Sequence, residues 1–127
     1  MHMYFVAIVL PSHLNEKILM YKNYMKEQYG CLVSLRSPAH ITIIPPFWMS
    51  EVNEASLFQH IHVISKAFSS FAIEADNFSS FKPRTIFIAL KENKLLAAVK
   101  KYAEDFLHQQ SIYKLKPESC HFILTSL

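Results

Sequence analysis

The sequence predicts an α+β domain made of duplicated β-α-β-β units, which form two lobes of mostly antiparallel sheet with helices packed outside and a ligand cleft between the lobes. Strand-like and helix-like segments alternate along the chain, but without the strict β-α-β repeat of a doubly wound sheet. The pattern also occurs twice. Tyr4 and Thr85 open similar apolar runs 81 residues apart (85 − 4), and His40 and His121 follow with the same separation (121 − 40).

Composition indicates a globular protein with one domain, residues 1–127. Hydrophobic residues make up 51% of the 127 positions, which is enough to build a core, and a single glycine argues against a flexible linker. The net charge of +3 favours an anionic ligand but is too small for a duplex-DNA-binding arm.

Membrane insertion and export are not expected. The apolar run at residues 4–10 is too short to span a bilayer and lacks the flanks of a signal peptide. The two cysteines, Cys31 and Cys120, are too few for a disulfide scaffold, so we expect free thiols and a cytoplasmic protein.

The chain opens with a predicted strand and helix. Residues 4–10 predict a strand buried on both faces, which Pro11 ends. Ser12 is the expected cap of a helix over residues 13–29, and Gly30 closes that helix. Its apolar stripe consists of Leu14, Ile18, Tyr21 and Met25.

The segment after this helix predicts two strands, residues 31–35 and 40–44, with a turn between them. The proline pair at 45–46 is expected to end the second strand. Ser50 then caps a second helix. The apolar stripe of this helix consists of Leu57, Ile61, Ile64 and Phe68.

The second half predicts a hairpin, a helix and a final extended segment. Residues 71–75 alternate apolar and polar side chains, 77–83 carry turn residues, and 85–90 form a β-rich run. We expect the two runs to pair. A third helix is expected over residues 92–109 and an extended chain over 113–127, which gives the order β-α-β-β-α-β-β-α-β-β.

A candidate catalytic face begins at His40. Alternation along the predicted strand puts His40 and Thr42 on one face and the intervening isoleucines on the other. An imidazole exchanges protons near neutral pH, and a threonine hydroxyl donates a hydrogen bond to a phosphate oxygen. In the second copy His121 is followed by Ile123, where a hydroxyl would be expected. Two imidazoles facing one anion are the minimum for paired acid and base catalysis, so the pattern indicates phosphoester chemistry.

Taken together, these segments resemble one family. The run SPAHITIIPPF, the opening strand YFVAIVLP, the strand RTIFIAL and a second histidine 81 residues after the first look like the two-histidine (2H) phosphoesterase superfamily, also called the 2′-5′ RNA ligase-like family. The resemblance covers almost the whole chain. It depends on the combination of motifs, because the triplet His-x-Thr alone arises often by chance.

The resemblance implies a bilobal fold with two His-x-Thr/Ser motifs facing one phosphate. One histidine would deprotonate the attacking water or hydroxyl, and the other would protonate the leaving oxygen, without a metal or other cofactor. The implied substrates are 2′,3′-cyclic phosphates, 2′-5′ linkages and related nucleotide cyclic phosphodiesters. Carried over residue by residue, His40 and Thr42 match the first motif, and His121 matches the histidine of the second.

The sequence departs from the family pattern at two points. Ile123 removes one contact to the phosphate, which would cost roughly 10²-fold in rate if that contact acts in the transition state. The chain also ends six residues after His121 (127 − 121), whereas family members continue through further strands. We therefore expect an incomplete second lobe, whose strand edges and apolar side chains favour a homo-oligomer.

Two further residues are candidates for substrate binding. Trp48, just after the proline pair, offers an aromatic wall for a base, and Arg84 stands beside the strand that opens the second repeat, where it would steer a phosphate. The alternative for Trp48 and its neighbour Phe47 is that they cover and fill the core. His60 and His62 are not expected to share a metal, because helix positions two apart project about 200° from each other.

Two functions stay open. The first is a phosphoesterase that acts on an RNA end or a small nucleotide 2′,3′-cyclic phosphate, with His40 and His121 as acid and base. The second is a catalytically impaired relative that binds a nucleotide, RNA or a protein partner, which Ile123 and the early end of the chain favour. We expect no metal, no cofactor and no membrane contact for either function.

Overall fold

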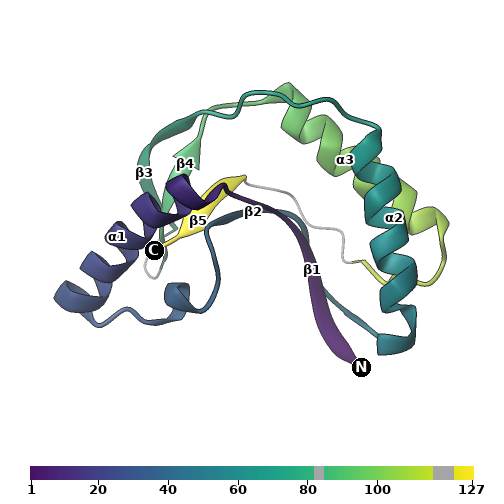
Figure 1. Cartoon of the computed structure of the whole chain (residues 1–127), viewed down its shortest axis with the longest axis horizontal. Helices are drawn as coiled ribbons and strands as arrows, with labels where there is room; N and C mark the ends of the chain where they lie inside the picture. The colour runs from purple at the N-terminus through teal and green to yellow at the C-terminus, as the bar shows by residue number, and fades with distance from the viewer. Residues whose placement is uncertain (82–84, 116–121) are drawn as a thin grey trace. The chain divides into compact units, whose positions relative to one another are not determined.

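The computed structural model describes residues 1–81, 85–115 and 122–127 and has the predicted α+β class. The helices are α1 (Ser12–Tyr29), α2 (Glu54–Lys66) and α3 (Lys94–Gln109), and short 3-10 helices lie at Val33–Arg36 and Glu51–Asn53. The strands are β1 (His2–Val9), β2 (His40–Met49), β3 (Ala75–Phe81), β4 (Thr85–Leu90) and β5 (Ile123–Ser126) (Figure 1).

The described strands form two sheets. β1 and β2 make a two-stranded sheet, and β3, β4 and β5 make a three-stranded sheet in that order. β4 is antiparallel to both of its neighbours, and Ile88 lies opposite Phe78 of β3 and Thr125 of β5. The pairing of β3 is irregular between Ala75 and Phe78, where Asn77 has a φ of 65°.

The chain divides into two compact units, and β1 and β2 each contribute residues to both. Unit 1 comprises Met1–Val6, Thr42–Ile73 and Glu92–Cys120. Unit 2 comprises Ala7–Ile41, Glu74–Lys91 and His121–Leu127. Because each unit takes segments from both halves of the chain, the units do not coincide with the two sequence repeats, and the duplication of β-α-β-β units stays a prediction.

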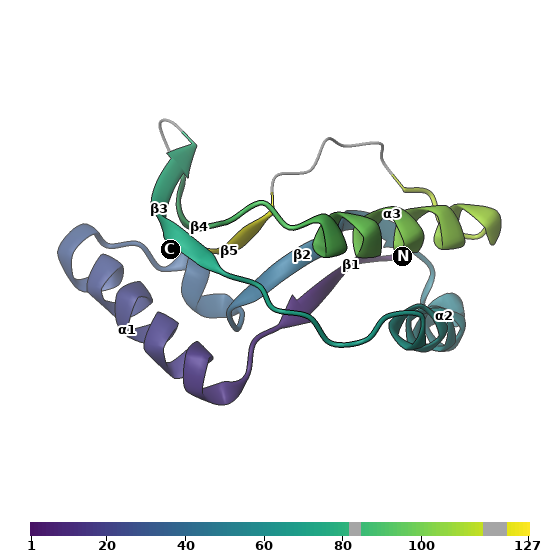
Figure 2. The ribbon, with the colours of Figure 1, turned by 90° about the horizontal axis from the view of Figure 1, so that it is seen from above.

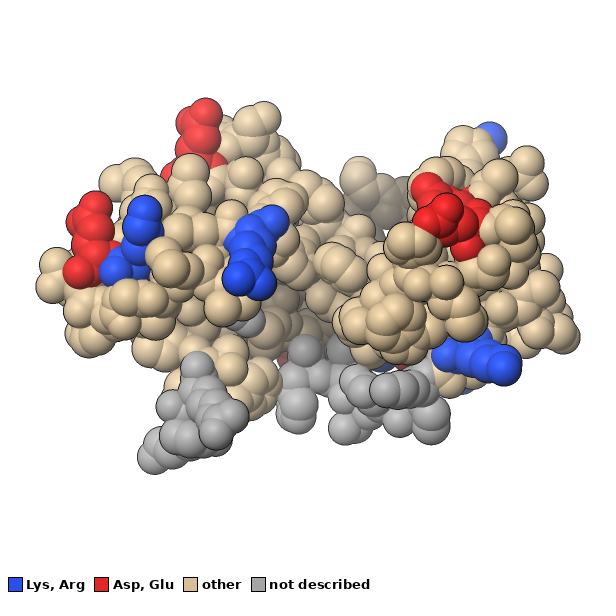
Figure 3. All heavy atoms as spheres, turned by 90° about the horizontal axis from the view of Figure 1, so that it is seen from below, with Lys and Arg blue, Asp and Glu red and all other residues tan. Residues whose placement is uncertain are grey.

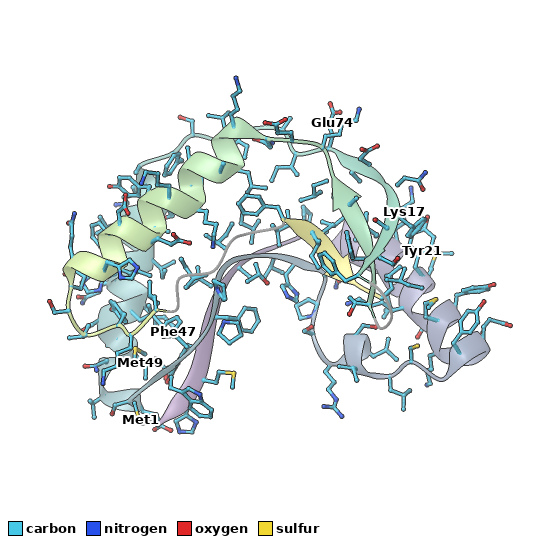
Figure 4. The ribbon with its side chains drawn as sticks, turned by 180° about the vertical axis from the view of Figure 1, so that it is seen from behind. Met1, Lys17, Tyr21, Phe47, Met49 and Glu74 are labelled. Atoms are coloured by element: carbon cyan, nitrogen blue, oxygen red, sulfur yellow. The ribbon has the colours of Figure 1, made fainter. Side chains whose placement is uncertain are left out.

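The core of unit 1 lies between α2, α3 and the second half of β2. α3 is joined to β2 directly, since Lys100 Nζ donates a hydrogen bond to the carbonyl of Ile43 at 2.8 Å. Phe47, whose position on β2 is labelled in Figure 4, is 2% exposed and therefore fills the core. The other buried apolar side chains of this unit are Ile43, Ile44, Met49, Leu57, Ile64, Leu96, Ala103, Leu107 and Tyr113.

In unit 2, α1 runs alongside the three-stranded sheet (Figures 1 and 2). Ile18 of α1 packs with Ala39 and with Ile88 of β4, and partly buried leucines surround this cluster. At the outer side of the sheet, Tyr21, labelled in Figure 4, meets Phe78 of β3 edge to face at 5.4 Å between ring centroids. Unit 2 thus has a smaller aliphatic core than unit 1.

The helices lie close to their predicted positions. The structure differs from the prediction at the N-termini of α1 and α2 and in the face of α1 that is buried. Ser12 is the first residue of α1 rather than its cap, because the carbonyl of Pro11 accepts from Leu14 and Asn15. Gly30 ends the helix in the left-handed conformation, as predicted. Ser50 precedes a 3-10 helix and makes no side-chain cap bond, so the prediction that it caps α2 is wrong.

The buried face of α1 is rotated from the predicted stripe. Ile18 and Lys22 are buried, whereas the predicted Leu14 and Tyr21 are exposed. Asn15 is half-buried on the same face. The rotation follows from what the helix meets, since polar backbone groups of the segment before β2 face α1 together with the apolar Ile88 cluster.

Predictions for the strands of the first half were wrong in three respects. Residues 31–35 do not form a strand, because Leu35 bonds back to Leu32 in a 3-10 turn. The proline pair at 45–46 does not end β2, which continues to Met49. β1 is not buried on both faces: it lies in a two-stranded sheet, and Phe5 and Val9 are exposed.

In the second half, two predictions were wrong. The strand β3 occupies Ala75–Phe81, where a loop over residues 77–83 was predicted, and not the predicted residues 71–75. The hairpin with β4 is confirmed, with the strand shifted along the chain. In the extended segment predicted at 113–127, the described strand is β5 alone. Within the described ranges, no helix combines the length and the apolar character needed to cross a bilayer.

Candidate functional site

His40 is the first residue of β2 and is half-buried. Its Nδ1 lies 2.8 Å from the carbonyl oxygen of Pro38. A carbonyl oxygen only accepts hydrogen bonds, so Nδ1 carries the proton in this arrangement and Nε2 carries the lone pair of the neutral ring. The contact thereby sets both the tautomer and the direction of the imidazole, which are the two properties that a general base needs to have fixed.

The turn before His40 is held by the backbone of Leu10, which follows β1, and by side chains of α1. Ala39 is fully buried, its N–H donates to Asn15 Oδ1 at 2.9 Å, and its carbonyl accepts from the N–H of Leu10 at 3.2 Å. Lys22 Nζ donates to the carbonyl of Ser37 at 2.9 Å. The residues on both sides of Pro38 are therefore tied to neighbouring segments, Ser37 to α1, and Ala39 to α1 and to Leu10.

Lys22 is an unusual member of this set, because it is 2% exposed. In the described part of unit 2 no carboxylate lies within ion-pair distance of its ammonium group. Burial lowers the pKa of Lys22 from its usual 10.5, since the charged form loses hydration. The charge is thus accommodated by a backbone carbonyl rather than by a counter-ion.

Thr42 lies two residues after His40 in the same strand. His40 and Thr42 are half-buried while Ile41 and Ile43 are buried, so the predicted alternation of faces is confirmed. Trp48 lies farther along β2 and is 55% exposed. Six residues of extended strand separate Trp48 from Thr42, which corresponds to about 20 Å, so the strand does not bring these two side chains together.

Two of the predicted site residues, His121 and Arg84, lie outside the described residues, as does Cys120. Ile123, which stands at the position of the missing hydroxyl, is half-buried in β5 and pairs with Ala89 of β4. Of the predicted site residues, the structure therefore describes His40 in unit 2 and Thr42 and Trp48 in unit 1.

His60 and His62 both lie on α2, in unit 1. His60 Nδ1 lies 2.6 Å from the hydroxyl of Tyr113, and its ring packs against Phe106 at 5.7 Å. Burial raises the pKa of Tyr113. His62 is exposed on α2. Among the described residues, no group of three or more His, Cys, Asp or Glu side chains is arranged to hold a metal ion.

Sequence reasoning does not select Asn15 or Lys22, although one signal for them exists. The two residues are seven apart and therefore lie on one face of a helix, together with Ile18 between them. Polar side chains on the same helix face as a buried isoleucine indicate that this face forms hydrogen bonds with a neighbouring segment. Their partners, however, are backbone atoms that the sequence does not identify.

On the face shown in Figure 3, the described Lys and Arg side chains, drawn in blue, lie in separate groups, and Asp and Glu side chains, drawn in red, are also present. The net charge of the chain is +3.

Comparisons with known proteins add no family to this description. The chain matches no family model, and a search of curated proteins finds no match. The resemblance to two-histidine phosphoesterases thus depends on the sequence motifs quoted above.

Proposed function

We propose that the chain is a phosphoesterase of the two-histidine type, which acts on an RNA end or a small nucleotide 2′,3′-cyclic phosphate by paired-histidine acid and base catalysis. The observation that carries the proposal is the hydrogen bond from His40 Nδ1 to the Pro38 carbonyl. With the proton on Nδ1, Nε2 is the nitrogen of this half-buried imidazole that would exchange a proton with a substrate.

Thr42 supports the proposal because its side chain lies on the same face as His40. A hydroxyl in this position donates to a phosphate oxygen while the imidazole acts on the attacking or leaving oxygen. His121 is proposed as the second histidine on the basis of its sequence position. It lies 81 residues after His40 (121 − 40), which is also the separation of the two sequence repeats.

The substrate proposed here is small or is the end of a chain. The small net charge of +3 supports this, since a compact cyclic phosphate needs few cations. Arg84 is proposed to steer the phosphate, and Trp48 to stack on a base. Because Trp48 lies about 20 Å beyond Thr42 along β2, it would meet a second nucleotide of an RNA end rather than the base next to the phosphate.

The proposal is tested by measuring hydrolysis of 2′,3′-cyclic nucleotides by the wild-type protein and by His40→Ala, His121→Ala and His62→Ala. We expect a loss of at least about 10²-fold for the first two variants, because each removes an acid or a base. His62→Ala, which changes an exposed histidine on α2, should retain wild-type rates. Activity that survives both His40→Ala and His121→Ala excludes the mechanism.

A second candidate function is a non-catalytic relative that binds a nucleotide, an RNA end or a protein partner. Ile123 favours it, because an isoleucine half-buried in β5 supplies no hydrogen bond to a phosphate. Calorimetric titration with a 2′,3′-cyclic nucleotide separates the two candidates. Binding without turnover supports the second, whereas turnover that disappears with either histidine rules it out.

Self-association is proposed as a property of the same molecule. β3 lies at the edge of the three-stranded sheet, all seven of its residues are exposed, and Phe78 presents half of its surface. An exposed edge with apolar side chains pairs readily with another strand. Size-exclusion chromatography should show a dimer at high protein concentration, and a monomer at every concentration would remove this proposal.

A further inference from the structure

The peptide unit between Pro38 and Ala39 connects α1 to the candidate catalytic histidine. Its carbonyl oxygen is the acceptor for His40 Nδ1, and its N–H is the donor to Asn15 Oδ1. A trans peptide is planar, so its N–H and C=O point in opposite directions and turn together. Fixing the N–H with Asn15 therefore fixes the carbonyl that selects the tautomer of His40.

Lys22 restrains the neighbouring peptide unit. Its ammonium donates to the carbonyl of Ser37, the acceptor of the peptide unit that precedes Pro38. Proline has a fixed φ and no N–H, so the peptides on its two sides carry the polar groups by which this turn can be held. Asn15 and Lys22, two helical turns apart, hold one peptide each.

Packing alone does not account for the ammonium group of Lys22. A buried lysine without a carboxylate loses hydration, and an apolar side chain of similar length would fill the same space at lower cost. Buried polar groups that reduce the stability of the fold are frequent at functional sites. The backbone that Lys22 contacts lies three residues before His40.

We propose that Asn15 and Lys22 are positioning residues for His40, which keep its imidazole in the form protonated at Nδ1 with Nε2 directed at the reacting atoms. The catalytic role of these two residues rests on the proposed function. The arrangement of the histidine ring itself can be measured whether or not the protein turns over a substrate, so the two proposals can fail separately.

The test is ¹⁵N NMR of the histidine rings, in which the two nitrogens of each tautomer have distinct chemical shifts. In the wild-type protein the neutral ring of His40 should carry its proton at Nδ1. Asn15→Ala should move His40 toward the mixed tautomers of a solvated imidazole. Asn15→Asp keeps an oxygen that accepts from Ala39 and should restore the wild-type signal.

Lys22→Met is the second variant, and Lys17→Met, which changes an exposed lysine of α1, is its control. Lys22→Met should broaden or shift the His40 signals, since the peptide before Pro38 loses its donor, while Lys17→Met should leave them unchanged. In the hydrolysis assay we expect kcat to fall by roughly 10²-fold for Asn15→Ala with little change in KM, because the base is misdirected while the ligand contacts remain.

The outcomes separate the two proposals. A His40 tautomer that is unchanged in both Asn15→Ala and Lys22→Met overturns the positioning role, and it leaves the phosphoesterase proposal intact. A tautomer that responds as expected in a protein without turnover confirms the positioning role and removes the catalytic function. A wild-type His40 protonated at Nε2 overturns the positioning role at its first step.

Discussion

Helices α1 and α3 each bury one lysine, and they do so in different ways. In α3, Lys100 donates to the carbonyl of Ile43 and also forms an ion pair with Glu104, four residues away, at 2.7 Å. In α1, Lys22 donates to the carbonyl of Ser37 and pairs with no carboxylate among the described residues of its unit. The lysine of α3 carries its own counter-ion, whereas that of α1 does not.

The two helices also differ in how many apolar side chains they bury and in how their N-termini are capped. α3 buries Leu96, Ala103 and Leu107 and is capped by Asn93, whose side chain accepts from the N–H groups of Leu95 and Leu96. α1 buries Ile18 and lacks a side-chain cap. α3 thus uses its buried face mainly for apolar packing, whereas α1 uses part of its buried face to hold the turn before His40.

The largest effect is expected from the apolar face of α3. Leu107→Ala should lower the free energy of unfolding by about 2–5 kcal/mol, because Leu107 is 0% exposed and its truncation leaves a cavity. Leu19→Ala on α1, where the side chain is 42% exposed, should cost much less. Urea unfolding followed by circular dichroism measures both. Equal losses would contradict the contrast between the helices.

The paired lysine of α3 should give the next largest effect. Lys100→Met leaves the carbonyl of Ile43 without its donor and Glu104 without its partner, so we expect a loss of about 1–3 kcal/mol. The neighbouring Lys101→Met is a matched control, since Lys101 forms the same kind of pair with Asp105 but is 81% exposed. A loss as large for Lys101→Met would show that burial does not matter here.

The helix caps allow a finer comparison. Asn93→Ala removes two hydrogen bonds to the first turn of α3 and should cost about 1 kcal/mol. Ser12→Ala at the start of α1 should change thermal unfolding little, because Ser12 makes no cap bond. A larger loss of stability for Ser12→Ala than for Asn93→Ala would contradict the assignment of Asn93, and not Ser12, as a capping residue.

The smallest effect at neutral pH is expected for Lys22→Met, within about 1 kcal/mol, because the lost hydrogen bond is offset by relief of the buried charge. The difference should depend on pH. Burial lowers the pKa of Lys22 in the folded chain, so between that pKa and 10.5 the unfolded chain binds more protons. The stability of the wild type should therefore rise relative to Lys22→Met as pH increases toward 10.5. Parallel stability curves would contradict the burial of a charged lysine.

Segments with a strong periodicity were predictable from the sequence. The helical spacing of apolar residues located α1 and α3, and the β-branched run at 85–90 located β4 with its observed bounds. The alternation that starts at His40 gave the correct faces of β2 around Thr42. In these segments local pattern and tertiary packing favour the same structure.

The remaining features depend on contacts that distant segments provide. Four of the seven residues of β3 are polar and all seven are classed as exposed, so its strand conformation comes from pairing with β4 rather than from its own sequence. The partner of His40 Nδ1 depends on how one peptide is turned, which no pattern of side chains encodes. His121 and Arg84 lie outside the described residues, and their roles stay predictions.

The continuation of β2 through Pro45 and Pro46 limits how the two-stranded sheet can grow. Successive residues of a strand direct their N–H groups to opposite edges, so two adjacent prolines remove one donor from each edge. The edge of β2 that faces away from β1 therefore offers an incomplete ladder to any incoming strand. A proline pair inside a strand, which usually marks the end of a strand, thus disfavours the addition of a further strand at this edge.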